Sequence, residues 1–137
     1  MRMRLIELLP LAVAAGLLVA ASSSVAAQDG VLSVAQLIRL PAEADGKRVQ
    51  VRGVLYDAGG VSADFTDRSA DENTTVDIET MEPKLRRYVF ANCGGSVIAP
   101  ECEFVLDGEV EHIPASDGGA AYNQLRDARP IRPPRGA

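Results

Sequence analysis

The sequence predicts a mainly β domain, a small five-stranded barrel with one or two short helices, preceded by a signal peptide. The chain has 137 residues and is 47% hydrophobic, which suits one globular domain. Four of its stretches alternate apolar and polar residues, as half-buried strands do. The chain also starts with two arginines followed by an apolar run, which is typical of an export signal.

The first 27 residues match the order of a signal peptide. Arg2 and Arg4 precede an uncharged run from Leu8 to Ala21, which is shorter than the roughly 20 residues that span a bilayer. Small residues in 25–27 predict cleavage after Ala27, leaving a chain without a transmembrane anchor. We therefore expect a periplasmic or secreted protein. An uncleaved anchor or a buried helix is the alternative.

Both cysteines, Cys93 and Cys102, fall in the expected mature chain. An even cysteine count in an exported protein predicts a disulfide, which here closes a short loop. The spacing does not match the Cys-x-x-Cys of reactive dithiols. A three-ligand metal site with His112 is the other reading, and nothing in the spacing favours it.

The mature chain is expected to begin with a short helix and a strand. Ser33 and Gln36 form a capping box pattern, and Pro41 ends the helix. Residues 47–56 alternate, with Val54 and the arginines Arg48 and Arg52 on the outward face. Gly53 inside this strand indicates a bulge or a tight bend.

Two further strands and a helix are expected in the middle of the chain. Residues 61–66 and 74–80 alternate, and a polar loop over 67–73 joins them. Pro83 suits the first turn of a helix over 83–90, beside Glu82. Leu85, Tyr88 and Val89 form its apolar stripe.

The fourth strand is expected over 101–113, with four acidic side chains on one face. A weaker alternation over 123–131 predicts a fifth strand. The domain then covers residues 28–114, or extends to about 131 if the fifth strand forms.

Residues 132–137 are rich in Arg and Pro, which predicts a flexible tail. The arginines 126, 129, 132 and 135 recur every three residues, which would align them on one edge of a polyproline-like segment able to contact anionic lipid, lipopolysaccharide or the protein's own acidic face.

The order of these elements, with the helix between the third and fourth strands, is that of the OB-fold, a small Greek-key barrel. Residues 34–55 resemble the opening of bacterial OB-fold domains of the anticodon-binding type, in which a short helix leads into Asp-Gly-Lys-x-Val-x-Val-x-Gly. That motif stands here as Asp45, Gly46, Lys47, Val49, Val51 and Gly53. Val105-Leu106-Asp107-Gly108-Glu109-Val110 is similar to the fourth strand of that fold. Because the first and fourth strands of an OB-fold pair, the resemblance implies that Arg48 and Arg52 lie across from Glu109 and Glu111 and form cross-strand ion pairs. The chain also resembles small exported OB-fold proteins of Gram-negative bacteria. An unrelated small barrel or sandwich is the alternative fold.

The resemblance implies that the face of the second and third barrel strands binds a ligand. The candidate binding face comprises Arg52, Asp64, Thr66, Asp77 and Glu79. Its outward side chains carry three acids and no aromatic ring, and the whole chain has a net charge of −5. Both features argue against nucleic acid, because phosphate recognition needs basic and stacking groups. An acidic face meets a cationic partner or a divalent ion instead, or is merely solvated, and the 67–73 loop lacks the spacing of a calcium loop.

No catalytic motif stands out, because no Ser, Cys or Lys comes with a recognisable base, and no cofactor or metal is implied. His112 is expected to be a surface residue beside Glu111. We therefore expect a monomeric exported module that binds an envelope glycan, peptide, protein or cation. A small hydrolase using a carboxylate pair, or a purely structural envelope protein, are the alternatives.

Overall fold

A computed structural model describes residues 30–131, so the predicted signal peptide and the 132–137 tail lie outside the described residues. The helices are α2 (Val34–Ile38) and α3 (Pro83–Asn92), with two 3-10 turns at Ala42–Ala44 and Pro100–Cys102. The strands are β1 (Val31–Ser33), β2 (Arg48–Gly59), β3 (Ser62–Thr66), β4 (Asn73–Asp77), β5 (Glu103–Ile113) and β6 (Tyr122–Pro130).

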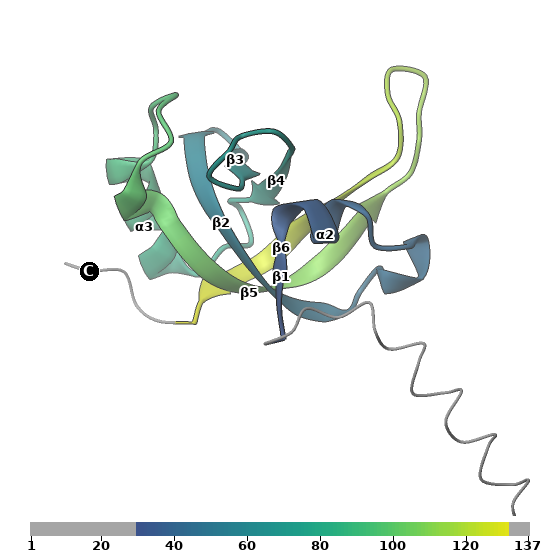
Figure 1. The fold of residues 1–137 in the computed structure, drawn as a ribbon. Helices are drawn as coiled ribbons and strands as arrows, with labels where there is room; N and C mark the ends of the chain where they lie inside the picture. The colour runs from purple at the N-terminus through teal and green to yellow at the C-terminus, as the bar shows by residue number, and fades with distance from the viewer. Residues whose placement is uncertain (1–29, 132–137) are drawn as a thin grey trace, which may run out of the picture.

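Within the described residues, five strands close into a barrel in the order β2-β3-β4-β6-β5 and back to β2 (Figure 1). The β4–β6 contact is parallel and the other four are antiparallel. With α3 between β4 and β5, this is an OB-like barrel, and the mainly β fold class is confirmed. The weakly predicted fifth strand is real, and as β6 it completes the ring between β4 and β5.

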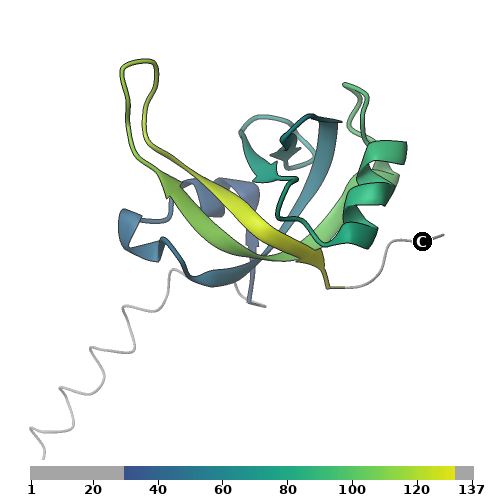
Figure 2. The ribbon, with the colours of Figure 1, turned by 180° about the vertical axis from the view of Figure 1, so that it is seen from behind.

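Strand β1 was not predicted, because three residues are too few to show an alternation. It pairs in parallel with β2 outside the barrel ring, at Leu32 opposite Val51. Figures 1 and 2 show α2 and α3 at opposite sides of the barrel. The hairpin between β5 and β6 projects away from the body.

The core fills the barrel with the inward residues of every strand, as the alternation predicts. On β5 the inward residues Phe104, Leu106 and Val110 are buried, and the residues between them are half-buried. Helix α2 adds Val34 and Leu37, and α3 adds Leu85 and Val89. Those four are removed from water almost completely, which stabilises the domain by about 1.5–3 kcal/mol each.

Both helix starts are made as the sequence predicts. The Ser33 hydroxyl accepts from the Gln36 amide, and the Gln36 side chain accepts from the Ser33 amide. Helix α3 has Pro83 in its first turn, and the Glu82 carboxylate accepts from the Leu85 amide. These contacts occupy amide donors that have no partner within the helix.

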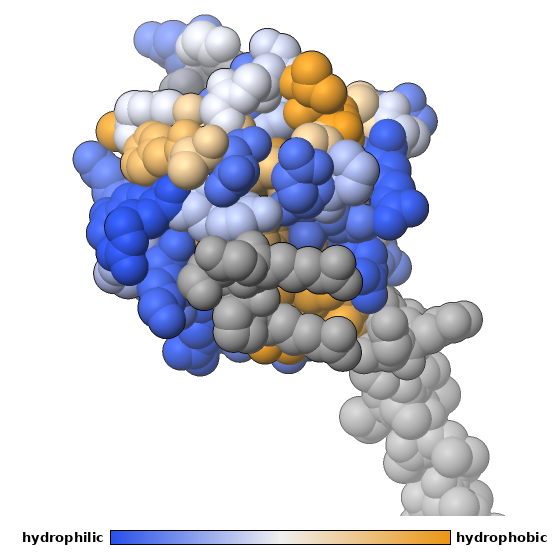
Figure 3. All heavy atoms as spheres, turned by 90° about the vertical axis from the view of Figure 1, so that its left-hand side faces the viewer, coloured by the Kyte–Doolittle hydropathy of each residue, from blue (hydrophilic) through white to orange (hydrophobic). Residues whose placement is uncertain are grey.

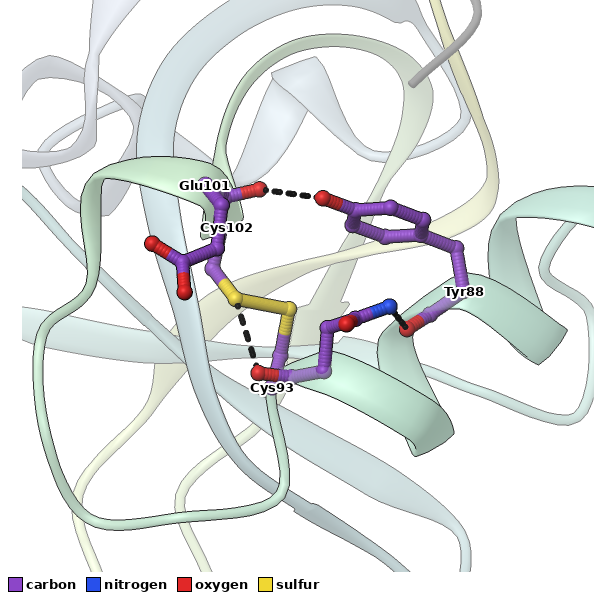
Figure 4. The surroundings of a disulfide bond; sticks show 5 residues. Tyr88, Cys93, Glu101 and Cys102 are labelled. Carbon is purple, nitrogen blue, oxygen red and sulfur yellow. Dashed lines mark hydrogen bonds between the residues drawn. A yellow bond between two sulfur atoms is a disulfide. The ribbon is translucent and has the colours of Figure 1, made fainter. Parts of the chain in front are cut away.

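The predicted disulfide between Cys93 and Cys102 is present and buried. It joins the end of α3 to the turn before β5. Figure 4 shows Tyr88 reaching across from α3 to the segment that carries Cys102, where its hydroxyl donates to the Glu101 carbonyl at 3.0 Å. The Tyr88 ring also meets Phe104 edge-on, at 5.9 Å between centroids. The bridge and the ring together hold α3 against the start of β5.

Three expectations about side-chain placement are wrong. Thr66 and Val54, predicted to face solvent, are buried register partners. The Thr66 hydroxyl donates to the Glu72 carbonyl at 2.8 Å, so the loop after β3 folds back over this part of the barrel. The predicted ion pairs of Arg48 and Arg52 with Glu109 and Glu111 do not form. Arg48 lies opposite Glu109 but pairs with Asp107 at 2.8 Å.

The expected polyproline-like arrangement of the C-terminal arginines is also wrong where it can be examined. Arg126 and Arg129 belong to β6, because closing the barrel requires those residues in the ladder with β5. The other two arginines of the series lie outside the described residues.

Gly53 is required by close packing, and the predicted bulge lies elsewhere in β2, between Tyr56 and Gly59. A Cβ at Gly53 would lie 2.7 Å from both the Phe65 ring and a Val34 methyl. Neither neighbour can retreat easily, because both are fully buried. The glycine therefore lets α2 and β3 approach the same point of β2.

Replacing Gly53 by alanine should destabilise the domain by about 1–3 kcal/mol, the cost of overpacking a filled core. Gly59→Ala is the matched control, since a Cβ there meets nothing within 4 Å. Urea unfolding of both variants measures the difference. Equal stability of Gly53→Ala and Gly59→Ala would contradict the packing argument.

Candidate functional site

An open groove of about 550 Å³ lies where β1 and β3 meet along one edge of β2. Strand β1 pairs with residues 50–52 of β2, and β3 pairs with the strand from Val54 onwards. Gly53 falls between the two ladders. The groove is lined there by β1, Gln36, Arg52, Gly53, Asp67, Arg68 and Glu103.

Arg52 is the member of the groove that the sequence singled out. It alternates outward on β2 and is exposed, opposite the uncharged Val105 of β5. Within residues 30–131 its guanidinium forms no ion pair and no side-chain hydrogen bond. The groove thus contains a guanidinium whose hydrogen-bond donors are not used by any of the described residues.

Two other charges of the groove neutralise each other. The Arg68 guanidinium binds Glu103 with its NH2 group at 2.6 Å and its Nε at 3.2 Å from both carboxylate oxygens. This hydrogen bond and the charge of Glu103 raise the pKa of Arg68 further above its ordinary value. The pair connects the loop after β3 to the first residue of β5.

Asp67 completes the charged lining. Its Oδ1 accepts from the Ser69 amide at 3.1 Å, the Ser69 hydroxyl at 2.6 Å and the Ala70 amide at 3.1 Å. These donors are neutral and belong to the same loop, which forms a tight Asx turn. In the described part of the chain, Asp67 has no ion pair.

The other predicted face residues lie away from the groove. Asp64 points outward from β3, in register with Tyr56 and Thr75. Asp77 ends β4, and its carboxylate accepts from the Glu79 amide and the Thr80 hydroxyl. Glu79 follows the strand and is exposed, and Thr66 is buried. Of the five predicted residues, only Arg52 lines the groove.

Asp64 occupies an unfavourable position for a carboxylate. Partial burial raises its pKa above the ordinary value of 3.8, and the charge of Asp57 raises it further. Asp57 has a positive φ of 49° at the β2 bulge. Its amide donates to the Gly95 carbonyl at 2.9 Å, which fixes the bulge against the disulfide loop.

A polar row continues from Asp64 around the outside of the barrel. The Thr75 hydroxyl donates to Gln124, whose side-chain amide donates to Glu111 at 2.8 Å. These contacts connect β4, β6 and β5 on the outside of the barrel.

His112, which was expected at the surface beside Glu111, is half-buried and has a structural contact. Its Nδ1 lies 2.9 Å from Oδ1 of the buried Asn123, whose amide group is occupied by the carbonyls at the end of α2. Among residues 30–131, no group of three or more His, Cys, Asp or Glu side chains is placed to hold a metal ion.

Sequence reasoning missed Asp67, Arg68 and Glu103 as groove residues. Arg68 and Glu103 are far apart in the chain, and only the barrel topology brings them together. The one local signal is the Asp-x-Ser order at the start of the 67–73 loop, which favours an Asx turn that fixes the Asp67 carboxylate.

The comparisons with known proteins leave the chain without an assigned family. No family model matches the sequence, and no curated protein is similar enough to count as a relative. In the part of the chain that the structure describes, no helix has the length and apolar character needed to cross a membrane.

Asp64→Asn should stabilise the domain at pH 7. Because the folded-state pKa is raised, ionisation of Asp64 disfavours the folded state, and stability falls as pH rises from the ordinary pKa of 3.8 through the raised value. The advantage of the variant should therefore disappear below pH 3.8. Thermal unfolding across pH measures this, with Asp71→Asn as an exposed control. A constant difference at every pH would contradict the account.

Proposed function

We propose that the chain is an exported binding module whose ligand occupies the groove beside Arg52. The observation that carries the proposal is a cation in an open groove, Arg52, whose guanidinium has no partner among residues 30–131. Small-ligand sites combine an apolar wall with a few polar groups in volumes of about 300–1,000 Å³. The groove, lined by the apolar Val31 and Leu32 together with Arg52, fits this description.

Export is supported by two independent features. The first 27 residues have the order of a signal peptide, with positive charges, an apolar run and small residues before the cleavage position. The disulfide supports the same conclusion, because such bonds persist mainly in oxidising compartments. We propose the periplasm of a Gram-negative bacterium as its location, which the resemblance to small exported OB-fold proteins favours.

A small hydrolase is the second candidate, and the specific observation behind it is the raised pKa of Asp64 beside Asp57. Perturbed carboxylates are common in active sites. Neither residue lines the groove, however, and catalysis needs a site that positions the substrate beside the acid. The binding module therefore accounts for more of the molecule.

A purely structural role is favoured less. The exposed large apolar residues come from separate parts of the described chain, with Val61 before β3, Phe90 on α3, Val97 in the disulfide loop and Tyr122 on β6. Figure 3 shows the side of α3 and the disulfide loop, where apolar patches are interrupted by hydrophilic side chains. A structural assembly surface would require a continuous patch.

A thermal-shift screen tests the proposal. The purified chain, with its disulfide intact, is heated with divalent cations, peptidoglycan fragments, other glycans, short peptides, lipopolysaccharide and oligonucleotides. A ligand at about 100 times its Kd adds roughly 2.7 kcal/mol, or several degrees. Arg52→Gln should weaken the binding of the active ligand about tenfold or more, because a charge-assisted hydrogen bond is lost.

Arg87→Gln is the matched control, since Arg87 is an exposed arginine on α3 outside the groove. It should bind like the unchanged chain. The proposal fails if no member of the panel raises the melting temperature. It also fails if Arg52→Gln and Arg87→Gln bind the active ligand equally well.

A further inference from the structure

We infer that the groove takes a dipolar ligand of the amino-acid or short-peptide class, with its carboxylate on Arg52 and its ammonium group on Asp67. This inference rests on the proposed function and specifies its ligand. Both charges line one open groove, and neither has an ion-pair partner within residues 30–131.

The charge balance of the groove points to a ligand that carries both signs. Four charged side chains line it, and two of them, Arg68 and Glu103, form an ion pair with three hydrogen bonds. One cation and one anion remain. A simple anion would be attracted by Arg52 but repelled by Asp67. A simple cation would be attracted by Asp67 but repelled by Arg52. A ligand with a carboxylate and an ammonium group satisfies both.

Arg52 is suited to the carboxylate end. A guanidinium presents a planar fork of donors that matches the two oxygens of a carboxylate. Its strand keeps the backbone fixed, because β2 is paired on both sides at this residue, with Ser33 of β1 and Val105 of β5. The side chain is thus attached to a rigid support in the lining of the groove.

Asp67 is suited to the ammonium end. Its three hydrogen bonds all reach Oδ1, so Oδ2 has no hydrogen bond among the described residues. Those contacts hold the carboxylate in one orientation, which lowers the conformational cost of binding. Because Asp67 and Arg68 are consecutive, the Arg68–Glu103 pair also ties this part of the loop to the barrel.

Calorimetry with tri-alanine tests the inference, using the free peptide, its N-acetylated form, its C-amidated form and the doubly blocked form. Blocking either end of the peptide should weaken binding to the unchanged chain about tenfold or more, and blocking both should weaken it further. The peptide backbone is the same in all four forms, so the series isolates the terminal charges.

Two variants assign each end. Asp67→Asn retains the oxygen that accepts from Ser69 and Ala70, and it should bind free and acetylated peptide equally. Arg52→Gln should bind free and amidated peptide equally. Asp71→Asn, in the same loop but outside the groove, should discriminate like the unchanged chain.

The outcomes separate this inference from the proposed function. In one outcome another member of the screening panel binds and Arg52→Gln weakens that binding, while tri-alanine does not bind or is insensitive to acetylation. The proposal of a binding groove then holds, and the inference of a dipolar ligand is wrong. If tri-alanine binds and neither Arg52→Gln nor Asp67→Asn changes its affinity, the peptide lies elsewhere and the inference is overturned. If nothing in either set binds, the proposed function fails as well.

Discussion

The barrel depends on one buried amide, the side chain of Asn123 at the start of β6. Its Nδ2 donates to the carbonyls of Leu37 and Leu40, at the end of α2, at 3.0 and 2.9 Å. The Leu37 carbonyl also accepts from the Leu40 amide at 3.2 Å, whereas the Leu40 carbonyl has no other partner among the described residues. Its Oδ1 lies 2.9 Å from Nδ1 of His112 on β5, and its backbone carbonyl accepts from the Thr74 hydroxyl on β4. One residue therefore links α2, β4, β5 and β6 at the point where the ring closes. Without the Asn123 amide, the partly buried Leu40 carbonyl would lose this partner, at a cost of about 1–3 kcal/mol.

The groove is a consequence of how the same ring is built. Helix α2 is held down by Asn123, and β1 immediately precedes it, so β1 is brought to the edge of β2. That edge is shared with β3, and Gly53 is the residue left between the two ladders. The absence of a side chain there admits Phe65 from within the barrel and Val34 from α2. The position of Arg52 beside the gap therefore follows from packing that serves the fold.

The sequence predicted those features whose causes are local. The alternation of β2 and β5, the Ser33 capping box, Pro83 at the start of α3 and the Cys93–Cys102 bridge each depend on neighbouring residues or on a strong chemical rule. The OB-like fold was then inferred from the order of these strands and helices along the chain.

The expectations that were wrong concern contacts between segments that are distant in the chain. Thr66 reads as an outward strand residue, yet a returning loop buries it. Arg48 and Glu109 are register partners as expected, but the side chain of Arg48 reaches Asp107 instead. The groove combines residues near 33, 52, 67 and 103, and no local sequence pattern predicts that these four segments come together.

A nitrogen-edited NMR titration of the labelled chain with zwitterionic tri-alanine tests the central claim most directly. The account predicts amide shift changes confined to residues 31–36, 52–53, 67–68 and 103, which surround the groove. Changes centred on Asp57 and Asp64, or on the hairpin over 114–121, or no changes at all, would contradict it.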